Sequence, residues 1–218
     1  NWLYEELKHT YYVGEIVSVK IGIVTDTGFL FFVNGEEITY EVIVTSKEGT
    51  NGSVTITDQM SKGLTFKEGI EVLKGNTAVR NVRFTPSSDR SSFTITLPEM
   101  AAGESYVVRY KCTADIELLD ADMTVRNTAK VNGKDSQGRE LEDETTVDHV
   151  FDVLKKTGVL NDDGTITWSI TINTAKADIS GWTLEDVITT ANGSSAYSGR
   201  VTIRNSNGSV LASNVTLP

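Results

Sequence analysis

Cysteine is nearly absent from this sequence. Cys112 is the only cysteine among the 218 residues, so no intramolecular disulfide and no thiolate-rich metal site can form. Small secreted domains commonly depend on disulfides for their stability. If this chain is exported, some other feature must stabilise its domains.

Positive charge is also scarce. The sequence has 20 lysines and arginines against 30 aspartates and glutamates, which gives a formal net charge of -10. A nucleic-acid binder needs clustered basic residues to displace counterions, so we expect no nucleic-acid partner. No apolar run approaches the roughly 18 residues of a membrane span, so we expect no membrane insertion of this fragment either.

Histidine is limited to His9 and His149, and neither has a serine or cysteine nucleophile motif near it. A hydrolytic triad therefore lacks its parts. Oxygen ligands occur in residues 161–164 and near Asp115, without the spacing of a calcium loop. We predict no enzyme acting on external substrates, no cofactor and no metal site.

Most of the sequence is dominated by an alternation of apolar and polar residues. Between Ile38 and Val44 every second side chain would face a core. Similar segments, separated by Gly, Asn, Asp and Ser clusters, predict strands at Ile16–Val24, Val54–Thr57, Val79–Phe84, Ser92–Leu97, Tyr106–Cys112, Val125–Val131, Thr145–Leu154 and Thr165–Asn173. Short strands at this spacing predict an all-β sandwich.

The sequence also repeats itself at an offset of 128 residues. The aligned pairs are Ile38 with Ile166, Tyr40 with Trp168, Val42 with Ile170, Val44 with Ile172, Val54 with Trp182, Ile56 with Leu184, and Asp58 with Asp186. Further on, Ile95–Pro98 aligns with Val215–Pro218 at an offset of 120. Because Trp168 and Trp182 fall on apolar repeat positions, we expect both in a core.

The repeat predicts tandem immunoglobulin-like β-sandwich domains, the second one incomplete. Residues 1–15 form an N-terminal segment of uncertain structure, in which 1–10 could make a short amphipathic turn. Residues 16–150 make a complete sandwich, and 151–218 make the first half of another. The strands that follow Pro98 in the first domain have no counterpart in the second.

These motifs together resemble the isopeptide-forming domains of Gram-positive surface adhesins and fimbrial subunits, of the collagen-adhesin A-domain type. The motifs are Gly35-Glu-Glu-Ile-Thr-Tyr-Glu-Val, Val54-Thr-Ile-Thr-Asp58, Lys62-Gly-Leu-Thr-Phe66, Leu97-Pro-Glu-Met-Ala-Ala-Gly103-Glu, Arg126-Asn127-Thr-Ala-Lys-Val131, Lys156-Thr-Gly158, Gly164-Thr-Ile-Thr-Trp168 and Leu184-Glu-Asp186. The resemblance implies that a lysine on the first strand is joined to an asparagine on the last by an intramolecular amide. A buried aspartate would assist.

In the first domain the resemblance implies Lys20 and Asn127 as the cross-linked pair and Asp58 as the proton shuttle. Burial in an apolar core would neutralise the lysine, and a protonated carboxyl would polarise the asparagine carbonyl. Lys20 lies on the strand face opposite Val19 and Ile21, so it could instead be a solvated residue. Similarly, Asp58 could simply cap a turn, and Asn127 could lie at the surface.

In the second domain Lys156, with Lys155 as its rival, takes the lysine position. Asp186 takes the acid position by the repeat, again with a turn cap as the plainer alternative. The partner asparagine would lie outside the chain, because the equivalent of Asn127 falls beyond Pro218.

These features favour a structural stalk or adhesin segment of a bacterial cell-surface protein, extracellular and anchored to the cell wall, whose partners are the neighbouring domains of the same protein. One alternative is a ligand-binding adhesin module that grips a host extracellular-matrix protein or glycan at the domain junction. Such a module should expose an apolar patch near residues 145–160. A second alternative is a fimbrial shaft subunit.

Overall fold

The computed structural model describes residues 17–24, 34–80, 82–120, 122–135, 137–189 and 201–215. Strands dominate these residues, which also contain a 3₁₀ helix, η1 (Ile116–Leu118). Within the same ranges no helix has the length and apolar character needed to cross a bilayer. The turn considered for residues 1–10 lies outside the described residues.

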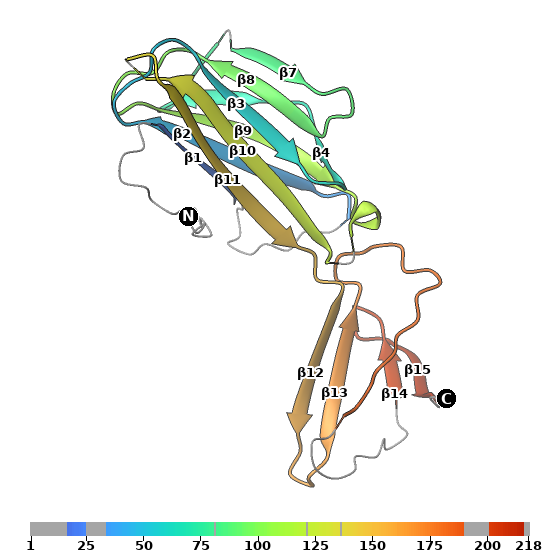
Figure 1. The fold of residues 1–218 in the computed structure, drawn as a ribbon. Helices are drawn as coiled ribbons and strands as arrows, with labels where there is room; N and C mark the ends of the chain where they lie inside the picture. Colours follow the sequence, from blue (N-terminus) through green and yellow to red (C-terminus); the bar gives the residue numbers. More distant parts are fainter. Residues whose placement is uncertain are drawn as a thin grey trace. The chain divides into compact units, whose positions relative to one another are not determined.

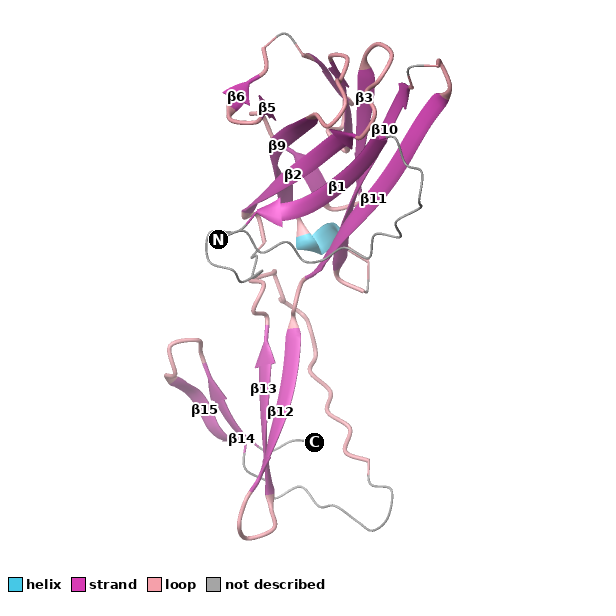
Figure 2. Ribbon diagram, turned by 90° about the vertical axis from the view of Figure 1, so that its left-hand side faces the viewer, coloured by secondary structure: helices cyan, strands magenta, loops and turns pink. Residues whose placement is uncertain are grey.

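Two antiparallel sheets pack face to face in the first domain (Figure 1). Sheet 1 has the strand order β1-β2-β9-β5-β6, with β4 also paired to β9. Its strands are β1 (Val17–Val24), β2 (Glu37–Ser46), β4 (Leu64–Phe66), β5 (Glu71–Lys74), β6 (Thr77–Ala78) and β9 (Ser105–Ala114). Figure 2 shows β1, β2 and β9 side by side in this sheet.

Sheet 2 has the strand order β11-β10-β3-β8-β7. Its strands are β3 (Val54–Met60), β7 (Arg83–Pro86), β8 (Ser92–Leu97), β10 (Thr124–Lys134) and β11 (Glu140–Val150). The first strand of the domain therefore belongs to sheet 1 and the last to sheet 2. The backbone N–H of Val19 on β1 donates to the Asp143 carboxylate on β11 at 2.7 Å, which links these two edge strands.

The core lies between the sheets and follows the predicted alternation. On β1 the buried residues are Val17, Val19, Ile21 and Ile23, and on β8 they are Phe93, Ile95 and Leu97. Each such side chain contributes roughly 1.5–3 kcal/mol when fully buried. The prediction of an all-β sandwich is confirmed.

Beyond β11 the strand pairing is local. In the described part of the chain, β12 (Leu154–Leu160) pairs only with β13 (Ile166–Ile172), and β14 (Val201–Arg204) only with β15 (Val210–Val215). The chain forms two compact units with their boundary between Ile179 and Ser180, so the β12–β13 hairpin belongs to the first unit. The strand pairing, in contrast, changes after Val150.

Two predicted strands differ from the observed ones. The segment Thr145–Leu154 is divided, because β11 ends at Val150 and β12 begins at Leu154. Between them Phe151 turns into the core, and its N–H donates to the carbonyl of Met123, outside β10. The predicted strand Val79–Phe84 is also wrong at Val79, Arg80 and Val82, since strand β7 begins only at Arg83.

The prediction that Trp168 and Trp182 are core residues is wrong for this structure. Their exposed fractions are 45% and 59%. Trp168 lies on β13, and no strand outside its own hairpin pairs with it among the described residues. Its repeat counterpart Tyr40 is buried because a second sheet covers it in the first domain. Among the described residues no second sheet covers Trp168.

Candidate functional site: a buried Asp–Tyr–Asn cluster

Three polar side chains meet in the core of the first domain. Asp58 lies on β3 and Asn127 on β10, adjacent strands of sheet 2. In the register of these strands Asp58 is opposite Ala129 and Asn127 is opposite Met60, so Asp58 and Asn127 are diagonal neighbours on the same inward face. Tyr110 reaches them from β9 in sheet 1.

Tyr110 connects the two sheet 2 residues. Its hydroxyl donates to Oδ2 of Asp58 at 2.5 Å and accepts from Nδ2 of Asn127 at 2.8 Å. Asp58 and Asn127 have an exposed fraction of 0%, and Tyr110 of 1%, so these hydrogen bonds are shielded from water. A hydrogen bond in such surroundings is electrostatically stronger than one at the surface.

Two acceptor atoms of the cluster have no hydrogen-bond partner in the structure. They are Oδ1 of Asp58 and Oδ1 of Asn127. An unsatisfied buried acceptor costs roughly 1–3 kcal/mol, and more if it belongs to a charged group. This arrangement therefore disfavours an ionised Asp58.

The surroundings of the cluster are mostly apolar. The ring of Phe93 meets Tyr110 edge-on at 4.9 Å between centroids, and Tyr40 stacks on Tyr110 at 5.7 Å. Burial raises the pKa of Asp58 from 3.8 to about 7, although the hydrogen bonds of Tyr110 and Asn127 partly counteract this rise. Burial likewise raises the pKa of the Cys112 thiol, with the nearby Asp58 adding to the effect.

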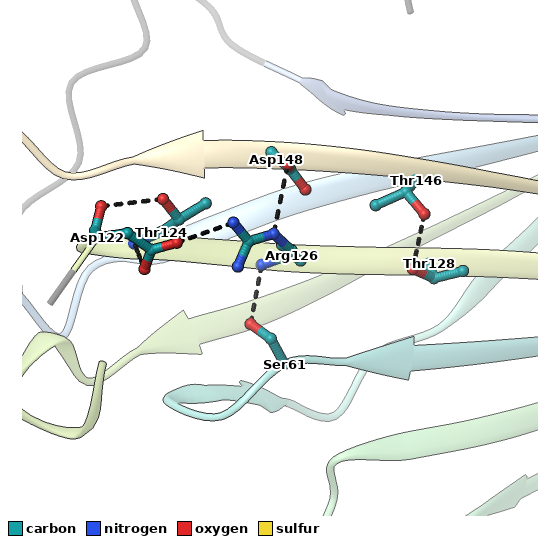
Figure 3. Close-up of polar contacts among 7 residues, drawn as sticks. All are labelled: Ser61, Asp122, Thr124, Arg126, Thr128, Thr146 and Asp148. Atoms are coloured by element: carbon teal, nitrogen blue, oxygen red, sulfur yellow. Dashed lines mark hydrogen bonds and ion pairs between the residues drawn. The ribbon is translucent and has the colours of Figure 1, made fainter. Parts of the chain in front are cut away.

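Figure 3 shows polar contacts of Arg126 and Thr128, the residues on either side of the buried Asn127 in β10. The flanking residue Arg126 donates from its backbone N–H to Oγ of Ser61 at 2.8 Å, and its guanidinium contacts Asp122 and Asp148. On the other side of Asn127, the hydroxyls of Thr128 and Thr146 lie 2.8 Å apart. Because strand side chains alternate between faces, holding the flanking residues outward holds Asn127 inward.

The structure brings Asp58 and Asn127 together but does not bring Lys20 to them. Lys20 is an exposed residue of β1, between the buried residues Val19 and Ile21, and it is paired with Ile43. This outward position is the one that the alternation of β1 predicts for Lys20, and the structure leaves its proposed cross-link untested. In the described residues every lysine is exposed except Lys130, which is half-buried.

Lys155 and Lys156, the lysine candidates of the predicted second domain, lie on opposite faces of β12. Lys156 is paired with Ile170, and its Nζ lies 4.5 Å from the centroid of the Trp168 ring. Lys155 points to the other face of the hairpin, as the alternation requires. Asp186 is exposed, lies outside any strand and belongs to the second compact unit.

Sequence reasoning did not single out Tyr110. It occupies an inward position of β9 between the buried residues Val108 and Cys112. A buried tyrosine usually finds a hydrogen-bond partner for its hydroxyl, so an inward tyrosine was a signal for a polar group in the same core. Its pairing with Asp58 and Asn127 depends on contacts between sheets, which strand patterns do not specify.

No protein-family model matches this chain, and no curated protein sequence matches it. Solved structures do match. The full-length major pilin SpaD from Corynebacterium diphtheriae aligns with a TM-score of 0.50 and 13% identity, over 65% of this chain and 36% of SpaD. A structure of SpaD domains D2 and D3 gives 0.50 and 15%, over 64% of this chain and 53% of that one.

This chain has the fold of Gram-positive pilin domains. It spans about a third of the length of SpaD. A lower TM-score of 0.43, at 12% identity, relates the chain to ACE19, the collagen-binding subdomain of the Enterococcus faecalis surface protein ACE, over 66% of this chain and 100% of that one. At these identities the likeness concerns the fold.

Proposed function

We propose that this chain is a structural segment, a stalk or adhesin region, of a Gram-positive surface protein displayed outside the cell and anchored to the cell wall. The observation that carries this proposal is a two-sheet sandwich with the fold of pilin domains, followed along the chain by a second hairpin that repeats its β1–β2 pair. Its partners are the neighbouring domains of the same protein.

The interior of the sandwich supports a mechanical role over catalysis on external substrates. The conspicuous chemical groups, Asp58, Tyr110 and Asn127, are sealed in the core and touch residues of both sheets. Groups placed there can hold the two sheets together, whereas an external substrate could not reach them. The chemistry we consider for this chain is therefore intramolecular.

The resemblance implies an amide between Lys20 and Asn127, and the structure does not test it. The neighbouring Asp58, whose pKa is raised to about 7, supports it because a protonated carboxyl could polarise the Asn127 carbonyl. The outward position of Lys20 counts against it. In the second domain, the placement of Lys156 on the apolar face of its hairpin supports Lys156 over Lys155 as the cross-linking residue.

The exposed apolar residues near the domain junction have an explanation other than ligand binding. Leu154 and Leu160 share one face of the β12–β13 hairpin with Trp168. By the repeat, that face corresponds to the inner face of β1–β2, which is core in the first domain. A module that grips a host extracellular-matrix protein or glycan is thus a secondary candidate. A fimbrial shaft subunit is the other alternative.

Localisation tests the proposal directly. Antibodies raised against the recombinant chain should detect it in the cell-wall fraction that a muralytic enzyme releases from the producing bacterium, and protease treatment of intact cells should remove the signal. A cytosolic marker protein controls for lysis. Recovery of the chain in the cytosol of intact, protease-treated cells would contradict the proposal. Saturable binding of the purified chain to immobilised matrix proteins would favour the ligand-binding alternative.

A further inference from the structure

The registers of two hairpins identify which residue of the first domain occupies the position of Lys156. In β12–β13, Lys156 is opposite Ile170. The repeat aligns Ile170 with Val42 on β2, and Val42 is opposite Ile21 on β1. Ile21, and not Lys20, is therefore the structural counterpart of Lys156.

The residue pairs on either side in the same two hairpins support this assignment. Across the same hairpins, Leu154 corresponds to Val19 and Gly158 corresponds to Ile23. All three β1 residues, Val19, Ile21 and Ile23, are buried. The first domain thus has an aliphatic side chain, 1% exposed, where the second has an amine.

The buried cluster contains no lysine, so its hydrogen bonds must be satisfied by Asp58, Tyr110 and Asn127 themselves. Tyr110 donates to one oxygen of Asp58 and accepts from the amide nitrogen of Asn127. The remaining oxygens, Oδ1 of Asp58 and Oδ1 of Asn127, are both unpartnered acceptors if Asp58 is ionised. A proton on Oδ1 of Asp58 would make that atom a donor, and Oδ1 of Asn127 is the acceptor of the cluster that lacks a partner.

We propose that the first domain holds a dormant amide-forming site, in which Asp58 and Asn127 are in place, Ile21 occupies the lysine position, and a proton on Asp58 closes a ring of hydrogen bonds with Tyr110 and Asn127. In this ring each side chain donates once and accepts once. The inference goes beyond the proposed function, because it holds wherever the protein is located.

Among the described residues packed around Asp58, no positively charged group would stabilise its ionised form. The groups that strand register, hydrogen bonds and electrostatics place beside the carboxyl include Tyr40 from β2, Phe93 from β8, Tyr110 and Cys112 from β9, and Asn127 and Ala129 from β10. The titratable ones, the two tyrosines and the cysteine, have pKa values raised by burial and so are neutral at physiological pH. Ionising Asp58 would therefore bury a charge without a counter-charge.

A lysine at position 21 would supply the missing reactant. Its Nζ, kept neutral by the apolar core, would attack Cγ of Asn127 while the Asp58 carboxyl donates a hydrogen bond to Oδ1. The Nζ–Cγ bond forms, the Cγ–Nδ2 bond breaks, and Asp58 relays a proton from Nζ to the leaving nitrogen, which departs as ammonia. The step needs no oxidant and no further reactant.

Intact mass under denaturing conditions tests the dormant site. The wild-type chain should have the full mass calculated from its sequence, whereas Ile21→Lys should weigh one ammonia molecule less than calculated, with fragmentation locating the link between positions 21 and 127. The matched control Ile21→Lys with Asp58→Asn should keep its full mass. Ammonia loss from the wild-type first domain, or a full mass for folded Ile21→Lys, would overturn the proposal.

A second measurement covers the case in which Ile21→Lys fails to fold. Carbon-13 NMR of the wild-type Asp58 carboxyl, assigned by comparison with Asp58→Asn, should show that it remains protonated well above the range of an ordinary aspartate. In Tyr110→Phe, which opens the ring, the Asn127 side-chain amide signals should shift while those of Asn132 on the outer face stay in place. A wild-type Asp58 that titrates like a solvated aspartate would refute the ring.

Discussion

Tyr110 on sheet 1 donates its hydroxyl hydrogen bond to Asp58 on sheet 2 across the core of the first domain, at 2.5 Å. Most contacts between the sheets are apolar and tolerate small shifts. A hydrogen bond between two buried groups has a narrow range of distance and angle. This contact therefore constrains how the two sheets align, in addition to stabilising their packing.

Removing the Tyr110 hydroxyl should destabilise the first domain. Tyr110→Phe keeps the ring and leaves buried groups of Asp58 and Asn127 without partners, so the free energy of unfolding should fall by about 1–3 kcal/mol. Chemical denaturation measures this fall. Tyr40→Phe is the matched control, because Tyr40 stacks on Tyr110 outside the hydrogen-bonded cluster. Equal losses in both variants would show that the contact between the sheets contributes nothing specific.

The stability of the first domain should decrease as the pH rises through neutrality. The folded-state pKa of Asp58, about 7, lies above its ordinary value of 3.8, so the folded state binds the proton more tightly than the unfolded chain. The resulting stability is complete below the unfolded pKa and is lost as pH rises through the folded one. Between about pH 5.5 and about pH 8.5 we expect a loss on the order of 2 kcal/mol.

Urea denaturation at a series of pH values measures this dependence. Asp58→Asn should remove it, because the amide does not titrate. The exposed Asp115→Asn serves as the control and should leave the dependence unchanged. A wild-type domain that is equally stable at both ends of the range would disprove the expectation.

Cys112 should react with thiol reagents only when the first domain unfolds. Its side chain is buried, its Sγ lies 3.8 Å from Sδ of Met60, and burial raises its pKa, so little reactive thiolate exists in the folded state. Labelling rates should rise with denaturant in parallel with unfolding. Lys111→Cys in a Cys112→Ser background moves the thiol to the exposed neighbouring position and should label at once. Rapid labelling of native wild-type Cys112 would contradict this prediction.

Gly158→Ala should displace the Trp168 ring from Lys156. A Cβ at position 158 would lie 2.6 Å from the indole, closer than packed carbon atoms approach, whereas the present arrangement places Nζ of Lys156 4.5 Å from the ring centroid. The ring-current shift of the Lys156 side-chain protons in NMR spectra should therefore diminish. Thr157→Ala, on the other face of β12, should leave it unchanged. Identical Lys156 shifts in wild type and Gly158→Ala would rule out this contact.

The sequence by itself determined most of the strands, the repeat and part of the site. Alternation at Val17, Val19, Ile21 and Ile23 was sufficient to predict a buried face of β1, because side chains of a strand alternate regardless of what covers them. The order of motifs pointed to Asp58 and Asn127, which do meet. The same alternation already placed Lys20 on the opposite face.

The tertiary structure decided which groups of different strands touch. The partnership of Tyr110 with Asp58 and Asn127 joins residues from two sheets, and no local pattern encodes a distance between sheets. Likewise, motif order suggested Lys20 as the first-domain lysine, but strand register assigned its position to Ile21. A shift of one residue reverses the face of a side chain, so only the pairing of β1 with β2 could distinguish a dormant site from an active one.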